Sequence, residues 1–315
     1  MDAKEEESPG SHLPKESGEV VAQTVPALSK TPFFEAINAL RYQRQAMIKA
    51  IEDQTKCPLI CYVAGINAAV HRDDIIGFVD LLHNLESEHA LDFLLHTPGG
   101  DTDAAEKIIY MVRKKVGKAK LRIIVPDYAK SAGTFMVLAA DSVVMSDSSE
   151  LGPIDPQVIR SDGTNRFADS VLSYLDAYET HKETLSKDPS NVTAQIMMNK
   201  LDPSRLKSFE AMKERARKGA EAVLQDGMFK DGRPYTQTVT ELLGLEKTKT
   251  LVTHGQPLNA KDAANPKIGL VVDYRPPDEP EWQLYWQLYV HQRLALTNDK
   301  QKLYESNRVS IVVDP

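Results

Sequence analysis

The feature that most constrains the fold is a regular alternation of apolar runs and amphipathic stretches. Four short apolar runs have the character of buried strands, at residues 59–64, 91–95, 121–125 and 142–145. The stretches between them, such as 74–85 and 101–116, place apolar side chains on one face at helical spacing. Strands that alternate with helices in this way predict β-α-β units and a mostly parallel sheet, and therefore an α/β fold.

The segments that flank this alternation differ from it in composition. Residues 1–30 are polar, with Glu5, Glu6 and Glu7 in a row, and predict a disordered acidic tail. A helical pattern then begins near Pro32 and continues to about Asp53. Beyond residue 165 helical patterns dominate, at 167–186, 191–199, 203–224 and 235–243, before a last α/β piece with a strand at 268–272.

The sequence Arg275-Pro-Pro predicts a break, so we expect one domain over residues 31–275 and a helical C-terminal extension over 276–315. Within that extension, the repeated Trp-Gln-Leu-Tyr at 282–285 and 286–289 forms an aromatic stripe. Such a stripe is more typical of packing than of a ligand site, and we expect this helix to dock on the domain or to contact another subunit.

Charge and composition exclude several classes of function. The net charge of −7 argues against nucleic acid as a partner, because phosphate binding needs a basic surface. No apolar run is long enough to span a membrane, and no signal peptide opens the chain, so we expect a cytoplasmic protein. Cys57 and Cys61 are too few for a structural zinc site, and we expect neither a metal nor a cofactor.

Two loops at predicted strand ends carry the candidate chemistry. Thr-Pro-Gly-Gly-Asp at 97–101 can point backbone N–H groups at an anion, although it also fits a tight turn with Asp101 or Thr102 as the helix cap. Ser131 begins the next helix, where it fits either a nucleophile or a helix cap. Because neighbouring parallel strands lie about 4.8 Å apart, the two loops should meet, one supplying oxyanion donors and the other a hydroxyl.

At this point the segment resembles the serine dehydrogenase proteinase family, relatives of signal peptide peptidase A within the Clp/crotonase superfamily. The matching stretches are His-Thr-Pro-Gly-Gly-Asp at 96–101, Ala-Lys-Ser-Ala-Gly-Thr at 129–134, Ala-Ala-Asp at 139–141 and Ser-Glu-Leu-Gly-Pro-Ile-Asp-Pro-Gln at 149–157. A weaker likeness continues through residues 253–270, and the whole covers about 42–272. The resemblance implies a Clp/crotonase-like fold, a peptide or protein substrate and a homo-oligomer.

The resemblance also implies roles for individual residues. Ser131 falls on the family nucleophile, Gly99 and Gly100 on the glycine pair of the oxyanion hole, and Ala132 supplies the other amide. Asp155 lies on a rigid loop that lines the site. His96 precedes the glycines, where either a site-lining or a hydrogen-bonded structural role fits.

For the general base, no residue of this sequence clearly matches the position that the resembling families use. Asp155 stands close to the position of the Clp histidine and cannot replace a histidine unaided. Lys182 fits the longer spacing of the lysine in signal peptide peptidases, with His181 behind it and a solvated helix face as the alternative. A lysine base would need its pKa lowered by burial.

Three functions therefore remain open. The first is a serine peptidase that forms an acyl-enzyme on Ser131. The second is a binding or scaffold protein of the same fold that holds peptides without cleaving them. The third is a relative of crotonases acting on acyl-CoA thioesters, a reaction that does not need the serine.

Overall fold

The computed structural model describes residues 30–161, 163, 166–245, 251 and 253–314, so the predicted tail lies outside the described residues except for Lys30. The chain forms two compact units, Met1–Ala39 and Leu40–Pro315. In the first unit, helix α1 (Pro32–Ile37) begins after Thr31, whose hydroxyl accepts a hydrogen bond from the Phe34 N–H. Helix α2 (Ala39–Thr55) follows, and from Leu40 onward it belongs to the second unit. The single helix predicted from Pro32 is therefore interrupted, at Asn38, which caps α1.

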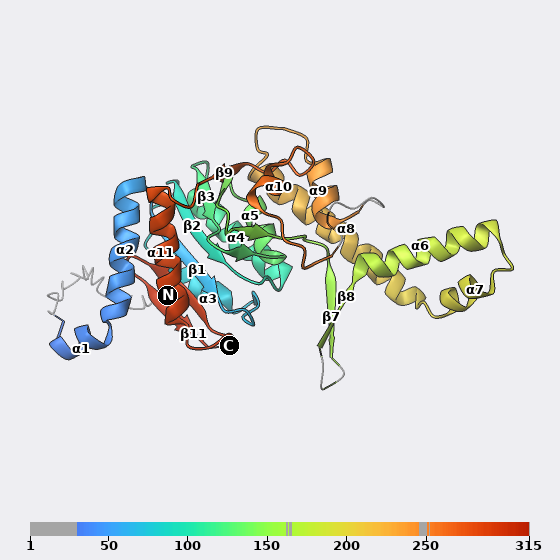
Figure 1. The fold of residues 1–315 in the computed structure, drawn as a ribbon, viewed down its shortest axis with the longest axis horizontal. Coiled ribbons are helices and arrows are strands. Elements are labelled where there is room, and N and C mark those ends of the chain that lie inside the picture. Colours follow the sequence, from blue (N-terminus) through green and yellow to red (C-terminus); the bar gives the residue numbers. More distant parts are fainter. Residues whose placement is uncertain (1–29, 162, 164–165, 246–250, 252, 315) are drawn as a thin grey trace, which may run out of the picture. The chain divides into compact units, whose positions relative to one another are not determined.

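A seven-stranded sheet organises the second unit, in the order β11-β10-β1-β2-β3-β5-β9 (Figure 1). Its parallel part consists of β1 (Leu59–Ala64), β2 (Leu91–His96), β3 (Leu121–Ile124), β5 (Ser142–Met145) and β9 (Val272–Tyr274). The four predicted apolar runs thus become four neighbouring parallel strands. The prediction of an α/β fold with a mostly parallel sheet is confirmed.

Helices cover both faces of the sheet. Helices α2 and α11 (Pro280–Ala295) lie on one face, where Ile48 and Ile51 meet Tyr285 and Leu288 over β1 and β2. The other face is covered by α3 (Asp74–His83), α4 (Thr102–Val116), α5 (Ala132–Leu138), α8 (Pro203–Asp226), α9 (Thr236–Leu243) and α10 (Ala260–Ala264). Burial on both faces explains why the parallel strands read as continuous apolar runs.

Residues 276–315 are integrated into this architecture and do not form a separate helical extension. Strand β10 (Lys302–Ser306) pairs antiparallel with β1, and β11 (Ser310–Val313) pairs antiparallel with β10. Trp282, Tyr285 and Tyr289 of the aromatic stripe are at most 4% exposed and pack against the sheet. The stripe is therefore part of the core, and burial of its rings rather than a subunit contact accounts for the pattern.

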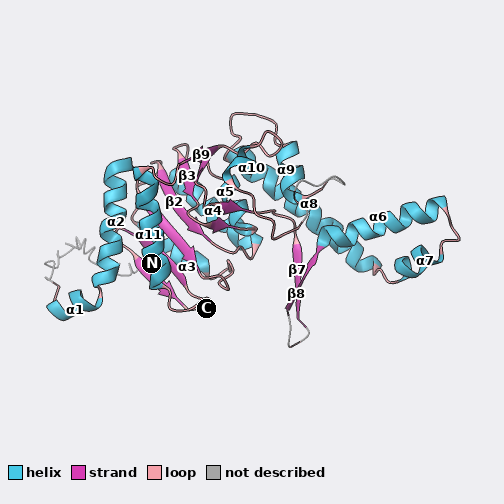
Figure 2. Cartoon of the chain, viewed as in Figure 1, coloured by secondary structure: helices cyan, strands magenta, loops and turns pink. Residues whose placement is uncertain are grey.

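Two smaller sheets lie outside the main one. Strands β7 (Gln157–Ser161) and β8 (Arg166–Ser170) form an antiparallel hairpin that leads into α6 (Val171–Lys187) and α7 (Val192–Asn199) (Figure 2). The helix predicted from residue 167 thus begins later, because Ser170 accepts a hydrogen bond from the Ser173 N–H and caps α6. The other pair is β4 (Tyr128–Ala129) with β6 (Glu150–Leu151).

In the part of the chain that the structure describes, none of the helices combines the length and the apolar character that crossing a membrane requires.

Candidate functional site

The two predicted loops lie side by side at the carboxyl ends of β2 and β3. The Thr97 N–H donates to the Tyr128 carbonyl at 3.0 Å, and the Lys130 N–H donates back to the Thr97 carbonyl at 3.1 Å. These bonds pair Thr97 with Ala129 in parallel register. The strand ends therefore bring the Pro-Gly-Gly turn against the residues that precede Ser131, at the edge where α/β sheets place their sites.

Ser131 has a backbone conformation that few non-glycine residues adopt. Its φ is 50° and its ψ is −114°, and its side chain makes no hydrogen bond to the N-terminus of α5. The residue is partly exposed, whereas Ala132 and Gly133 behind it are buried. The hydroxyl is consequently not used as a helix cap, which was the structural alternative for this serine.

Gly99 packs directly against Ser131. A Cβ at Gly99 would lie 2.6 Å from the Lys130 carbonyl oxygen and 2.8 Å from the Ser131 Cβ, and its φ of 97° also favours glycine. Its own N–H donates to the Thr97 hydroxyl at 3.2 Å, within the turn. Gly99 thus allows the close approach of the two loops, while its N–H is already engaged.

Gly100 packs against the backbone of Val70. The Val70 N–H donates to the Gly99 carbonyl at 2.7 Å, and the Asp101 N–H donates to the Val70 carbonyl at 2.9 Å. A Cβ at Gly100 would lie 2.4 Å from the Val70 nitrogen. The Asp101 side chain caps α4 by accepting hydrogen bonds from the Asp103 and Ala104 N–H groups. The turn is therefore held at both ends.

Two backbone N–H groups at this junction have no acceptor among the residues that the structure describes. Ala132 is the first residue of α5, and its N–H has no partner within a helix. Across the described part of the chain, neither the Ala132 nor the Gly100 N–H donates a hydrogen bond. Free backbone donors and an uncapped hydroxyl are two of the components that an acyl-transfer site needs.

The loop at residues 149–157 lies against the point where Lys130 and Ser131 connect β4 to α5, which we call the serine junction. The Lys130 ammonium donates to the Leu151 carbonyl at 2.9 Å and pairs with Glu150 at 2.7 Å. The Thr134 hydroxyl donates to the Ala129 carbonyl at 2.7 Å and accepts from the Gly152 N–H at 3.0 Å. These bonds fix both the position of this loop and the direction of the Lys130 side chain.

A histidine that the sequence did not single out joins this loop. The Leu151 and Leu258 backbones exchange two hydrogen bonds, which bring residues 253–258 beside the loop. There the His254 Nδ1 lies 2.7 Å from the Asp155 Oδ1, and the two side chains are 29% and 12% exposed. They line a cavity of about 220 Å³. Because 99 residues separate the pair, no local pattern signalled it.

Lys182, the predicted base, lies on α6 with its side chain 54% exposed. Its ammonium pairs with the Glu179 carboxylate at 3.2 Å, and this hydrogen bond raises the pKa of Lys182. A raised pKa is opposite in direction to what a general base needs. Within one chain, the ion pair between Lys182 and Glu179 therefore matches the alternative in which Lys182 lies on a solvated helix face. His181 precedes it on the same helix.

His96 is fully buried at the end of β2. Its ring packs against Tyr128 and Tyr289 in tilted arrangements, with ring centres 4.1 and 5.0 Å away. Burial, followed by the nearby Arg293 charge, lowers the pKa of His96 to about 3. The side chain thus packs toward α11 as a neutral imidazole, which is the structural role rather than the site-lining one.

Comparison with known families agrees with this geometry. Residues 34–256 match the model of the ClpP-like SDH-type serine proteinases, and this match includes both strand-end loops and the Asp155–His254 pair. The chain belongs to that family. The resemblance predicted from the motifs is confirmed.

Two relatives from Methanocaldococcus jannaschii are the uncharacterized proteins MJ1495 and MJ0137. Each is 29% identical to this chain, over 184 and 160 residues, covering 54% and 50% of this chain. The matches cover 59% and 52% of the relatives, so the chain spans little more than half of their length.

Two solved structures of the 1510-N membrane-bound stomatin-specific protease are also similar, one of them in complex with a substrate peptide. They share 22% and 18% of residues with this chain, with TM-scores of 0.28 and 0.29. The matches cover 49% and 75% of this chain and 77% and 99% of those structures.

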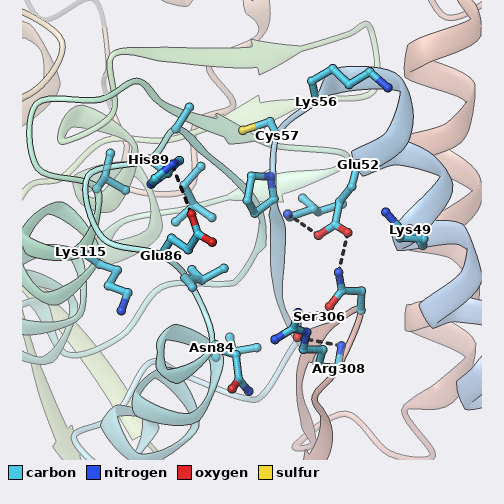
Figure 3. Close-up of a pocket in the computed structure, with 18 residues that line it drawn as sticks. Lys49, Glu52, Lys56, Cys57, Asn84, Glu86, His89, Lys115, Ser306 and Arg308 are labelled. Carbon is cyan, nitrogen blue, oxygen red and sulfur yellow. Dashed lines mark hydrogen bonds and ion pairs between the residues drawn. The ribbon is translucent and has the colours of Figure 1, made fainter.

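This family member also has a cavity of about 320 Å³ at the opposite end of the strands, near the start of β1 and β2 (Figure 3). Glu52 braces its wall by accepting hydrogen bonds from the Leu59 N–H and the Asn307 amide. The cavity lies away from the carboxyl edge where the serine junction is found. Within the described ranges, no three His, Cys, Asp or Glu side chains gather as a metal site would require.

Proposed function

We propose that this member of the serine proteinase family is an active peptidase that cleaves peptide bonds through an acyl-enzyme on Ser131. The observation that carries the proposal is the Ser131 conformation, with a φ of 50°, an uncapped hydroxyl and Gly99 packed against it. A non-glycine residue in such a conformation costs about 1–3 kcal/mol and persists where the surroundings enforce it, often at active sites.

The proposed reaction follows from the groups around the hydroxyl. The Ser131 Oγ attacks the carbonyl carbon of the scissile bond, and the carbonyl oxygen takes the negative charge. The free N–H groups of Gly100 and Ala132 are the proposed donors to that oxyanion, and each such donor contributes about 3–4 kcal/mol in well-studied enzymes. Gly99 serves this site through its lack of a side chain, because its N–H is bonded to Thr97.

The proposed substrate is a peptide or an unfolded protein segment, and the proposed working form is a cytoplasmic homo-oligomer. Apolar side chains on α7 support an assembly, since Val192, Ile196 and Met197 are 64%, 51% and 42% exposed. Exposed apolar groups that gather on one element are typical of contact surfaces.

The test is digestion of a defined peptide mixture by the full chain, followed by mass spectrometry of new peptide ends. The proposal predicts new ends with the unmodified chain and none with Ser131→Ala, which removes only the hydroxyl. Peptide binding without cleavage by both proteins would instead support a scaffold. Turnover of acyl-CoA thioesters that survives Ser131→Ala would support a crotonase-like reaction.

A further inference from the structure

We propose that Asp74 and Lys302 are positioning residues of the Ser131 site. Their buried ion pair holds the loop at 65–73, and this loop orients the Gly100 N–H. The inference deepens the proposed peptidase function and rests on it. It gives strand β10 a part in a site whose candidate groups all lie far from it along the chain.

The first argument concerns the peptide unit between Gly99 and Gly100. The Val70 N–H donates to the Gly99 carbonyl at 2.7 Å. In a trans peptide the C=O and the following N–H point in opposite directions, so this bond directs the Gly100 N–H away from Val70. Both flanking residues are glycines with positive φ, 97° and 146°, so no Cβ restricts rotation of the peptide. Val70 supplies the restraint that the glycines lack, because a rotated peptide would place a carbonyl oxygen where the N–H now lies.

The second argument is the set of donors around Asp74, whose side chain is 4% exposed. The carboxylate accepts four hydrogen bonds, from the Lys302 ammonium at 2.6 Å, the Tyr304 hydroxyl at 2.8 Å, the Tyr62 hydroxyl at 2.9 Å and the His71 N–H at 2.9 Å. His71 directly follows Val70 in the chain. The carboxylate therefore holds the backbone beside the residue that restrains the glycine peptide.

The third argument is that Asp74 and Lys302 depend on each other. Their side chains are 4% and 5% exposed, and the ammonium lies 2.6 Å from the carboxylate. A buried ion is costly without a partner of opposite charge. Lys302 comes from β10, 228 residues further along the chain. A strand near the end of the chain thus supplies the charge that the Asp74 carboxylate needs.

The loop relies on such contacts because its own backbone is irregular. Across residues 65–73, all of which the structure describes, there is no helix or strand. At the start of the loop, the Gly65 and Asn67 N–H groups donate to carbonyls in the segment 299–301, both at 2.9 Å. At its end, the loop is held through Asp74. The chain around β10 therefore fixes both ends of the loop.

Loss of the ion pair should act on the oxyanion donor and not on the nucleophile. Without the carboxylate, the His71 N–H loses its acceptor and Val70 is free to move. The Gly100 N–H then loses its direction, while the serine itself is unchanged. A donor to the oxyanion acts mainly on charge that develops in the transition state, so kcat should fall more than KM rises.

The test compares the double variant Asp74→Leu with Lys302→Met against the unmodified full chain. Replacing both partners avoids leaving one buried charge unpaired. We expect fluorophosphonate labelling of Ser131 to slow by about 10- to 100-fold and to keep its dependence on pH. On a peptide that the unmodified chain cleaves, kcat should fall by a similar factor, while KM changes by less than about twofold. The Val70 N–H should also exchange faster with deuterium.

The matched control is the double variant Asp92→Leu with Arg122→Met. It removes another buried ion pair of the same sheet, with nitrogen and oxygen 2.6 Å apart, near the amino ends of β2 and β3. Its labelling rate and its Val70 exchange should match those of the unmodified chain, whatever its urea midpoint. If the first double variant does not fold, Asp74→Asn takes its place, because it keeps the size of the side chain and one acceptor oxygen. It should slow labelling by about 10-fold.

Three outcomes would count against the proposals. An unmodified labelling rate and kcat in the folded variant at Asp74 would overturn the inference and leave the peptidase proposal intact. Equal slowing in the Asp92 control would also overturn it, because a general loss of stability would then explain the rate. A chain whose Ser131 is never labelled would overturn the peptidase proposal itself, and the inference with it.

Discussion

Substitution of Gly99 by alanine should damage both the fold and the site, by an amount that the structure allows us to work out. The new Cβ would lie 2.6 Å from the Lys130 carbonyl oxygen, so the two loops must separate by about 0.8 Å to reach an ordinary contact of 3.4 Å. The φ of 97° adds backbone strain of about 1–3 kcal/mol for a residue with a side chain. Overpacking adds about 1–3 kcal/mol.

We therefore expect Gly99→Ala to lower the free energy of unfolding by about 2–6 kcal/mol, measured by urea denaturation. The same displacement moves Ser131 relative to the free N–H groups. Because a misplacement of about 1 Å can cost a factor of about 100 in rate, labelling of Ser131 by a fluorophosphonate should slow by roughly that factor.

Gly232→Ala is the matched control, because Gly232 has a similar φ of 86° but nothing within 4 Å of the added Cβ. It should show the backbone strain of about 1–3 kcal/mol alone and unchanged labelling. If Gly99→Ala were no less stable than Gly232→Ala and labelled at the unmodified rate, the close approach of the two loops would have no part in the site.

Two further predictions concern buried ionisable side chains in the sheet. Arg122 donates two hydrogen bonds to Asp92, at 2.8 and 2.6 Å. Arg122→Ala should therefore lower the free energy of unfolding in urea by about 3–5 kcal/mol, and the double variant Asp92→Leu with Arg122→Met should recover most of this loss. A loss below about 1 kcal/mol for Arg122→Ala would contradict this prediction. The pKa of His96 is lowered to about 3, so the unfolded chain binds a proton first as pH falls. Above about pH 6.5 the His96 ring is neutral in both the folded and the unfolded chain, so it does not lower the free energy of unfolding. Between about pH 6.5 and pH 3 it lowers the free energy of unfolding by about 1.4 kcal/mol per pH unit, and His96→Gln should remove this contribution to the pH dependence. An unchanged slope would show that His96 does not titrate in this way.

The parallel core could be predicted from the sequence because its signal is local. Strands β1, β2, β3 and β5 are each a short apolar run, and helices α3 and α4 between them place apolar side chains at helical spacing. The positions of Ser131 and the glycine pair followed from the rule that parallel strands present their carboxyl ends at one edge.

The parts that sequence reasoning missed depend on long-range contacts. Strand β10 joins the sheet beside β1, about 240 residues earlier, and only tertiary structure makes that pairing visible. His254 and Asp155 likewise meet through the Leu151–Leu258 bridge, although 99 residues separate them along the chain. Lys182 fitted the spacing expected of a lysine base, but its exposure and its pairing with Glu179 could not be read from residue types.

The most direct measurement is peptide mapping by mass spectrometry after reaction with a fluorophosphonate. A nucleophilic Ser131 predicts one added phosphonyl mass on the peptide that contains residue 131, absent from Ser131→Ala and from chain unfolded before reaction. Contradiction would be a folded chain that gains no mass at residue 131, or one that gains the same mass at another serine after Ser131→Ala.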